Sequence, residues 1–269
     1  MERQSPIKVD ERECVRLPRT MKLTVLLLDT ETNGLPKNRY APISEPGAYP
    51  AILQLSWSTF TVTGRTLKSE TSRDIGVALH SSEAWDTGAA KIHGLTEVEA
   101  RGGTPAAEAL LELRTALQEV DVVIAHNLSF DKSVIRAAGY TEALRHPEQA
   151  AGLRSIWPLP SEIKEFCTMK TTRDMVRIPA TAKQAQYADL GRFKAPKLNE
   201  LYAWLYGHVY DISGATLHSA KSDTHCLAQC LAGLLRKGLV EVFEDTKALR
   251  LSASGLAATV SLDSPSETL

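Results

Sequence analysis

The spacing of apolar residues changes along the chain, and this change predicts an α/β fold. Residues 22–30 form a nearly continuous apolar run that is typical of a buried strand, and residues 51–62 predict a second strand. A turn at residues 63–65 then returns the chain as a third strand that ends near Ile75. The chain therefore begins with a predicted three-stranded meander.

Helical spacing replaces the meander further along the chain. Residues 104–120 place apolar side chains at helical intervals behind a Thr-Pro start, and residues 121–126 form a short buried strand that leads into a helix over 128–140. The remaining predictions are a strand at 165–168 and helices at 169–176, 197–207 and 222–237. We predict an α/β domain with a mixed sheet of about five strands flanked by helices.

Composition sets the boundaries of this domain. Residues 1–20 are polar and lack periodicity, so we expect a flexible N-terminal tail, and residues 241–269 are expected to form a loosely ordered C-terminal extension. The predicted domain covers residues 21–240. Residues 36–50 hold four prolines between the first two strands, which predicts an ordered surface loop.

Two acids follow the first apolar run. Asp29 and Glu31 are two residues apart, so on a strand their side chains leave the same face, about 6–7 Å apart. Like charges at this separation repel unless a cation lies between them. The alternative is that one of these acids only caps a turn, since Asp is common at strand ends.

Two further acids lie on apolar stripes of predicted helices. Asp131 precedes three apolar residues of its helix by three, four and seven positions, and Asp223 precedes four apolar residues of the last helix by four, seven, eight and eleven. A buried carboxylate is costly without a cation or a hydrogen-bond network. Lys or Arg from elsewhere in the fold could pair with these acids, but none falls on the same stripe within one helical turn.

The four acids together predict a metal site. Carboxylate oxygens without Cys or His favour two Mg²⁺ or Mn²⁺ ions rather than Zn²⁺, and such a pair assists in-line phosphoryl displacement. His218 lies five residues before Asp223, so we expect it on the loop that leads into the last helix. A neutral imidazole at that position can take a proton from the attacking water as a general base.

Charge and cysteine content indicate which partners and which cellular compartment to expect. The formal net charge of −1 gives no overall basic field, so any contact with nucleic acid depends on a local patch. The four cysteines include no CxxC pair, which favours a reducing intracellular compartment, either the cytoplasm or the nucleoid. No apolar run is long enough to span a bilayer, and the first residues lack a signal-peptide core, so neither a membrane nor secretion is expected.

Three motifs carry a resemblance to a known family. The segment DTET at residues 29–32, HNLSFD at 126–131 and HSAKSD at 218–223 resemble the three motifs of the DEDDh superfamily of 3′–5′ exonucleases. Its members include the proofreading epsilon subunit of bacterial DNA polymerase III, oligoribonuclease and the three-prime repair exonucleases, and they share a ribonuclease H-like fold. The resemblance covers about residues 22–240 and is closest to the bacterial and large-virus relatives of the epsilon subunit.

The resemblance implies roles for single residues. Asp29, Glu31, Asp131 and Asp223 correspond to the metal ligands, and His218 corresponds to the general base. By the same resemblance, the substrate-binding residues are Thr32, Asn33, Gly34, Leu35, His93, Thr96, His126, Asn127 and Phe130. Leu35 is expected to wedge against the terminal base, although Leu35 could also be part of a simple glycine turn, and Phe130 could equally be core. Asn33 departs from the usual Thr or Gly of the first motif.

These residues lead to one functional expectation and two alternatives. We expect a two-metal 3′–5′ exonuclease that hydrolyses single-stranded or frayed 3′ ends of DNA to nucleoside 5′-monophosphates, as in repair or proofreading. The first alternative is a 3′–5′ exoribonuclease that acts on short RNA. The second is an inactive nucleic-acid-binding module on the same fold. A polymerase partner follows only by analogy with the family.

Overall fold

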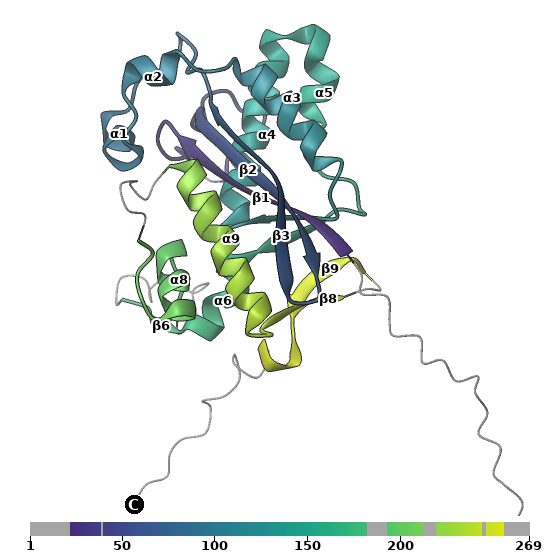
Figure 1. The fold of residues 1–269 in the computed structure, drawn as a ribbon. Helices are drawn as coiled ribbons and strands as arrows, with labels where there is room; N and C mark the ends of the chain where they lie inside the picture. Colours follow the sequence, from purple (N-terminus) through teal and green to yellow (C-terminus); the bar gives the residue numbers. More distant parts are fainter. Residues whose placement is uncertain (1–21, 39, 182–192, 212–218, 244–245, 256–269) are drawn as a thin grey trace, which may run out of the picture.

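The computed structural model describes residues 22–38, 40–181, 193–211, 219–243 and 246–255 (Figure 1). The predicted tail at residues 1–20 lies outside these described residues. A central five-stranded sheet with the order β3-β2-β1-β4-β5 organises the fold. Its strands are β1 Lys22–Thr32, β2 Ile52–Thr63, β3 Thr66–Gly76, β4 Val122–Ala125 and β5 Lys164–Cys167. The predicted meander and the mixed five-stranded sheet are both confirmed.

Strand direction places the ends of three strands at one edge of the sheet. Strand β1 pairs with β2 in the antiparallel direction and with β4 in the parallel direction, and β4 pairs with β5 in parallel. The carboxyl ends of β1, β4 and β5 therefore lie along the same edge. Asp29 and Glu31 lie near the end of β1, and Cys167 is the last residue of β5.

Helices cover both faces of the sheet (Figure 1). They are α1 Thr87–His93, α2 Glu97–Arg101, α3 Ala106–Leu117, α4 Leu128–Arg145, α5 Ala150–Arg154, α6 Thr168–Val176, α8 Leu198–Tyr206 and α9 Ala220–Arg236, with a short 3₁₀ turn η1 at Pro147–Gln149. Leu26 and Leu28 of β1 pack towards α3 and α4, whereas Val25 and Leu27 pack towards α8 and α9. Among the described helices, we find none with the length and apolar character that a membrane crossing requires.

The C-terminal boundary differs from the expectation of a loosely ordered extension beginning at residue 241. Strands β8 Val240–Phe243 and β9 Ala248–Leu251 pair as an antiparallel hairpin, and Val240 and Leu249 are buried against the core beneath α9. The sequence pattern did not predict this hairpin. It also missed a second small pair, β6 Ile178–Pro179 with β7 Phe193–Lys194, because two-residue strands carry no alternation.

Helix α4 is longer than the sequence predicted. The prediction ended at residue 140, but the helix continues to Arg145 because Glu142 and Ala143 remain on its buried side. Gly139 allows this continuation to pack closely against α5, since an added Cβ would lie only 2.5 Å from the Leu153 carbonyl oxygen. The short helices α1 and α2 were not predicted, because five to seven residues hold too little helical periodicity.

Candidate active site

Three of the predicted acids meet at the end of strand β1. Strand alternation places Asp29 and Glu31 on the face that α9 covers, and Asp223 lies in the first turn of α9. One carboxylate oxygen from each of the three residues lies within 4.8 Å of the others. Two acids from a strand and one from a distant helix therefore form a single cluster.

Contacts with strand β2 hold the start of α9 beside these acids. The Ala220 amide donates to the Gln54 side-chain oxygen at 3.2 Å, and the Thr224 hydroxyl donates to the Ser56 carbonyl at 3.4 Å. Gln54 and Ser56 are the β2 residues that pair with the two acids of β1. The helix turn that carries Asp223 is thus fixed to the neighbouring strand at the level of the acids.

Asp131 approaches the same point from the other face of the sheet. It lies in the first turns of α4, is only 2% exposed, and accepts a 2.9 Å hydrogen bond from the hydroxyl of Thr30. The group of acids with mutual oxygen distances under 4.8 Å does not include Asp131. The fourth acid therefore flanks the cluster, held in place by the β1 residue that lies between Asp29 and Glu31.

The acids shift one another's pKa values upward. Burial raises the pKa of Asp29 well above its ordinary value, and repulsion from Asp131, Asp223 and Glu31 adds to this effect. Burial and the charges of Asp223 and Asp131 raise the pKa of Glu31 to about 8. Burial also raises the pKa of Asp131 to about 7, against the opposing hydrogen bond from Thr30. Without a cation, this cluster resists carrying its full negative charge.

The donor set fits a divalent cation. In the part of the chain that the structure describes, no Lys or Arg forms an ion pair with Asp29, Glu31 or Asp131. Clustered carboxylate oxygens of this kind are the ligands that Mg²⁺ and Mn²⁺ prefer. The geometry supports the predicted metal site, with three acids assembled and the fourth beside them.

The predicted general base, His218, lies outside the described residues. The next residue, Ser219, is the N-cap of α9, and its side chain accepts from the Ser222 amide at 3.3 Å. His218 therefore directly precedes the helix that carries Asp223, and its role stays a prediction.

A cleft of about 580 Å³ opens beside the acids. Five of the predicted substrate-binding residues line it, namely Thr32, Gly34, Leu35, His93 and Phe130. Glu31 lies in the same wall, so the cleft reaches the acid cluster. The Leu35 side chain is 79% exposed, which is the arrangement expected of an apolar group that contacts a ligand rather than the core.

His93 presents an unsatisfied donor in this cleft wall. Its Nδ1 accepts from the Leu95 amide at 3.1 Å, so in the neutral ring the proton lies on Nε2. Nε2 is buried and has no hydrogen-bond partner among the described residues. Burial lowers the pKa of His93, which favours this neutral form.

Asn33 and Thr96 support the cleft from behind. The Asn33 amide group donates to the Ala84 carbonyl, and its side-chain oxygen accepts from the Asp86 amide at 2.9 Å. Thr96 is the N-cap of α2, where it forms a capping box with Glu99. Neither residue lines the 580 Å³ cleft, but Asn33 lines an adjoining cleft of about 630 Å³ together with Gly34 and Leu35.

His126 and Asn127 also make contacts within the protein. The His126 ring is hydrogen-bonded through Nδ1 to the Thr168 hydroxyl and through Nε2 to the Pro196 carbonyl, both at 2.9 Å. Burial lowers the pKa of His126 to about 4. Asn127 begins α4 in the left-handed conformation, with φ of 76°. Both ring nitrogens of His126 are therefore occupied within the protein, whereas the Asn127 side chain accepts only from the Ser129 hydroxyl at 3.2 Å among the described contacts. The substrate contacts of both residues stay a prediction.

Two residues near α1 were missed by the sequence reasoning. Asp86 lines the cleft, and the Trp85 ring lies edge-on to the His93 ring with centroids 6.0 Å apart. Asp86 caps α1 by accepting from the amides of Gly88 and Ala89. An Asp followed by Thr-Gly is a recognisable helix start, so this signal was present in the sequence. The partnership of Gln54 with α9 had no such signal, because it joins residues 166 positions apart.

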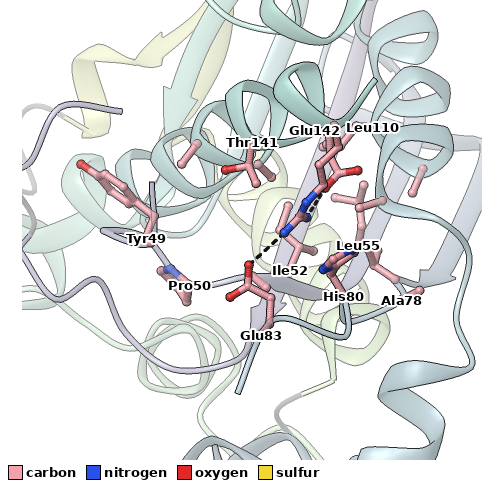
Figure 2. A pocket seen from close by; sticks show the side chains of 18 of the residues that line it. Tyr49, Pro50, Ile52, Leu55, Ala78, His80, Glu83, Leu110, Thr141 and Glu142 are labelled. Carbon is pink, nitrogen blue, oxygen red and sulfur yellow. Dashed lines mark hydrogen bonds and ion pairs between the residues drawn. The ribbon is translucent and has the colours of Figure 1, made fainter. Parts of the chain in front are cut away.

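A second, smaller cavity of about 50 Å³ lies between α3, α4 and the loop after β3. Figure 2 shows its apolar wall, which includes Ile52 and Leu55, and the ion pairs at its mouth. Arg145 contacts Glu142 at 2.5 Å and Glu83 at 3.3 Å. Here the buried acid, Glu142 at 6% exposure, is neutralised by the chain's own guanidinium group.

Comparison with known proteins depends on structure alone. No protein-family model matches the chain, and no curated protein matches it in sequence. The chain is similar in structure to E. coli exonuclease I in its zinc-bound complex with single-stranded DNA, with a TM-score of 0.55, 16% identity, and 81% of this chain and 41% of that chain covered. It is also similar to the same enzyme with a dA16 oligonucleotide, with a TM-score of 0.52, 14% identity, and 79% and 40% covered.

A third similar structure is a 3′-exonuclease that recognises the histone mRNA stem-loop. Its TM-score is 0.52 at 12% identity, with 86% of this chain and 91% of that chain covered. The present chain spans about two fifths of the length of exonuclease I but nearly the whole of this 3′-exonuclease. At these identities the likeness shows the fold, which is the ribonuclease H-like α/β fold of these exonucleases, with its mixed five-stranded sheet and flanking helices.

Proposed function

We propose that this protein is a divalent-metal-dependent 3′–5′ exonuclease that removes nucleoside 5′-monophosphates from the 3′ end of single-stranded DNA. The observation that carries the proposal is the convergence of Asp29, Glu31 and Asp223 within 4.8 Å, at one end of a cleft of about 580 Å³. The similarity in fold to exonuclease I and to an RNA 3′-exonuclease supports the same reaction class. The resemblance of the three motifs to the DEDDh superfamily supports it independently.

The proposed metal ligands are Asp29, Glu31, Asp131 and Asp223, which would hold two Mg²⁺ or Mn²⁺ ions. When bound, the ions would neutralise the negative charge that develops on the phosphate and on the leaving 3′-oxygen. Thr30 holds the Asp131 carboxylate through its 2.9 Å hydrogen bond, so this ligand enters the site with one orientation.

The protein's own residues would orient the substrate. Leu35 and Phe130 line the cleft as apolar groups suited to the terminal base, and the buried Nε2 of His93 would donate to an oxygen of the terminal nucleotide. His218 would accept the proton of the attacking water. The new bond joins the water oxygen to phosphorus, the bond from phosphorus to the 3′-oxygen breaks, and the leaving oxygen is protonated to a 3′-hydroxyl.

RNA is the second candidate substrate. The observation that favours it is the coverage of 91% of the stem-loop 3′-exonuclease, compared with 41% of exonuclease I. The reaction and the four acids would be the same for both substrates. A polymerase partner remains a prediction from the motif resemblance alone.

The test is digestion of 5′-labelled single-stranded DNA and RNA of the same sequence in Mg²⁺, with products resolved by length. We expect a ladder that shortens from the 3′ end, with DNA cleaved faster than RNA, and no ladder with Asp29→Ala. Faster cleavage of RNA would select the second candidate. Intact strands with both substrates, together with tight binding of either, would instead identify a binding module on this fold.

A further inference from the structure

A second polar cleft, of about 390 Å³, lies beside the N-terminal half of α4 and outside the acid cluster. We call it the basic cleft. Its lining residues are Leu128, Ser129, Lys132, Ser133, Arg136, Glu165, Cys167 and Lys170. Three cations face a single carboxylate there, in a protein whose formal net charge is −1.

One face of α4 supplies half of the basic cleft. Ser129, Lys132, Ser133 and Arg136 follow one another at intervals of three, one and three residues, so they share a side of the helix. Asp131 lies on a different side, where it is buried against β1. The same helix therefore carries a proposed metal ligand on one side and a row of hydroxyl and cationic groups on another.

The single carboxylate does not neutralise the cleft. Glu165 is engaged by Lys132 at 2.7 Å and by the Trp157 indole nitrogen at 2.8 Å. Arg136 and Lys170 form no ion pair within the part of the chain that the structure describes. The Nε of Arg136 is buried and lacks any hydrogen-bond partner there, which is costly for a guanidinium donor. This cleft therefore has two unpaired cations and an unsatisfied buried donor.

The basic cleft lies along the same sheet edge as the acid cluster. Cys167 ends β5, and in the sheet order β5 is separated from β1 by β4 alone, so two strand spacings, about 10 Å, separate the ends of β1 and β5. The cleft extends from Ser129 to Arg136, about 10 Å along the axis of α4. A strand whose 3′ end lies at the acids can reach it within a few nucleotides.

The chemistry of the lining identifies the group that would be bound. Guanidinium and ammonium donors match the oxygens of phosphate, and Arg in particular suits its geometry. The two serine hydroxyls already donate within the protein, Ser129 to the Asn127 side chain at 3.2 Å and Ser133 to the Ser129 carbonyl at 2.8 Å. No aromatic side chain is among the described residues that line the cleft, so bases have no ring on which to stack. Contacts of this kind are independent of base sequence.

We propose that the basic cleft binds backbone phosphates of the nucleic-acid strand upstream of its 3′ end, through Arg136 and Lys170. The inference rests on the proposed exonuclease function and adds the path of the substrate strand to it. The cleft binds the strand while successive nucleotides are removed from its 3′ end. It contributes to substrate affinity and takes no part in the hydrolysis.

The test compares two matched double variants. Arg136→Gln/Lys170→Gln removes the two unpaired cations, and Lys68→Gln/Arg73→Gln removes one Lys and one Arg from β3, the opposite edge of the sheet. Binding of 5′-fluorescein-labelled dT20 is measured by anisotropy in EDTA at several salt concentrations. Turnover of the p-nitrophenyl ester of thymidine 5′-monophosphate in Mg²⁺ reports the active site without any upstream backbone.

We expect the cleft variant to bind dT20 roughly tenfold more weakly at 0.1 M salt, and its salt slope to fall by about 1.4, since each phosphate contact on a single strand contributes about 0.7. Ester turnover stays at the wild-type rate, and the β3 variant matches the wild type in both assays. If the two variants bind dT20 equally well, the proposed role of the basic cleft is wrong. If the cleft variant still hydrolyses the ester at the wild-type rate, the proposed exonuclease function is unaffected by that result. If the wild type does not hydrolyse the ester, the proposed exonuclease function is contradicted. The comparison of dT20 binding would still show whether the basic cleft binds the nucleic-acid backbone.

Loss of folding is detected by the thermal midpoint. Should the double variant unfold, the single Lys170→Gln variant replaces it, because Lys170 is exposed. We expect this variant to lower the salt slope by about 0.7. An unchanged slope in the folded single variant also contradicts the proposal.

Discussion

Two groups of acids in this protein have opposite surroundings. At the mouth of the 50 Å³ cavity, Glu142 is held by Arg145 at 2.5 Å, so its charge is compensated within the fold. At the end of β1, Asp29 and Glu31 face Asp223 within 4.8 Å, and no described Lys or Arg pairs with either β1 residue. The difference teaches that what separates the two groups is the source of the compensating charge. For Glu142 it lies within the fold, whereas for the two β1 acids it would come from the proposed metal ions.

Removing one acid from the cluster should have the largest effect on activity. Asp29→Asn keeps the shape of the side chain but removes a proposed metal ligand, and we expect the rate of 3′-end cleavage to fall by about 10³-fold or more. The measurement is single-turnover digestion of labelled DNA. Glu142→Gln is the matched control at the other acid group, and we expect it to keep the wild-type rate. A comparable loss of rate in the control would erase the distinction between the two groups.

Removing the internal cation should instead affect stability. Arg145→Met leaves Glu142 buried without its guanidinium partner, and we expect the free energy of unfolding to fall by about 3 kcal/mol. Urea denaturation at neutral pH measures this loss. Cleavage by the remaining folded protein should be unchanged, and a variant as stable as the wild type would show that the ion pair is not what holds this acid.

Adding a divalent cation should stabilise only the acid cluster. With Mg²⁺ at one hundred times its dissociation constant, we expect about 2.7 kcal/mol of stabilisation of the wild type. The melting temperature should rise accordingly, and Asp29→Asn should lose most of this rise while Glu142→Gln keeps it. An equal rise in all three proteins would point to a cation site elsewhere.

The acid cluster should also make metal-free stability depend on pH. The pKa of Glu31 is raised to about 8 and that of Asp131 to about 7. An acid with a raised pKa in the folded state stabilises the fold while it is protonated, and this contribution is lost as pH rises through the folded pKa. We therefore expect stability in EDTA to fall from about pH 5 to pH 9. Glu31→Gln should exceed the wild type by about 1–3 kcal/mol at pH 9 and by little at pH 5. A difference that does not grow with pH would contradict the raised pKa.

The smallest expected effect concerns the placement of α9. Gln54→Met removes the acceptor for the Ala220 amide, and we expect a loss of about 1 kcal/mol in stability and a severalfold lower cleavage rate with KM unchanged. Gln54→Glu keeps an acceptor but places a further carboxylate opposite Glu31, so in EDTA we expect it to be no more stable than Gln54→Met. If Gln54→Met cleaves at the wild-type rate, this contact does not position Asp223.

Much of the fold was readable from sequence, for identifiable physical reasons. The apolar run of β1 and the long helices α3, α4 and α9 are long enough for periodicity to reveal them, whereas the two-residue strands β6 and β7 are not. The acids were found because Asp131 and Asp223 lie on apolar stripes, and the burial of Asp131 at 2% confirms that interpretation for this residue.

Other features of the site depend on contacts that a linear pattern does not contain. His126 was expected to contact substrate, yet both of its ring nitrogens bond within the protein, to partners 42 and 70 residues away. The basic cleft unites α4 with the end of β5 and the start of α6. Lys170 is one of several Lys and Arg residues between positions 170 and 197 of the sequence, but in the structure Lys194 pairs with Glu200 and Arg173 with Asp174. Counting Lys and Arg along the sequence does not show which of these cations form ion pairs in the structure and which do not.

The register shift between Glu31 and Thr32 separates two parts of the site that differ in how readily their backbone opens. Up to Glu31, β1 is paired along β2 and lies inside the sheet, so amide protons there should exchange with solvent only when the whole domain unfolds. Beyond the shift the ladder gives way to a turn in which Gly34 has φ of 113°. Asp29 and Glu31 are therefore anchored to a slowly exchanging strand, whereas Gly34 and Leu35, which line the cleft, lie beyond the last ladder contacts and can open on a shorter timescale.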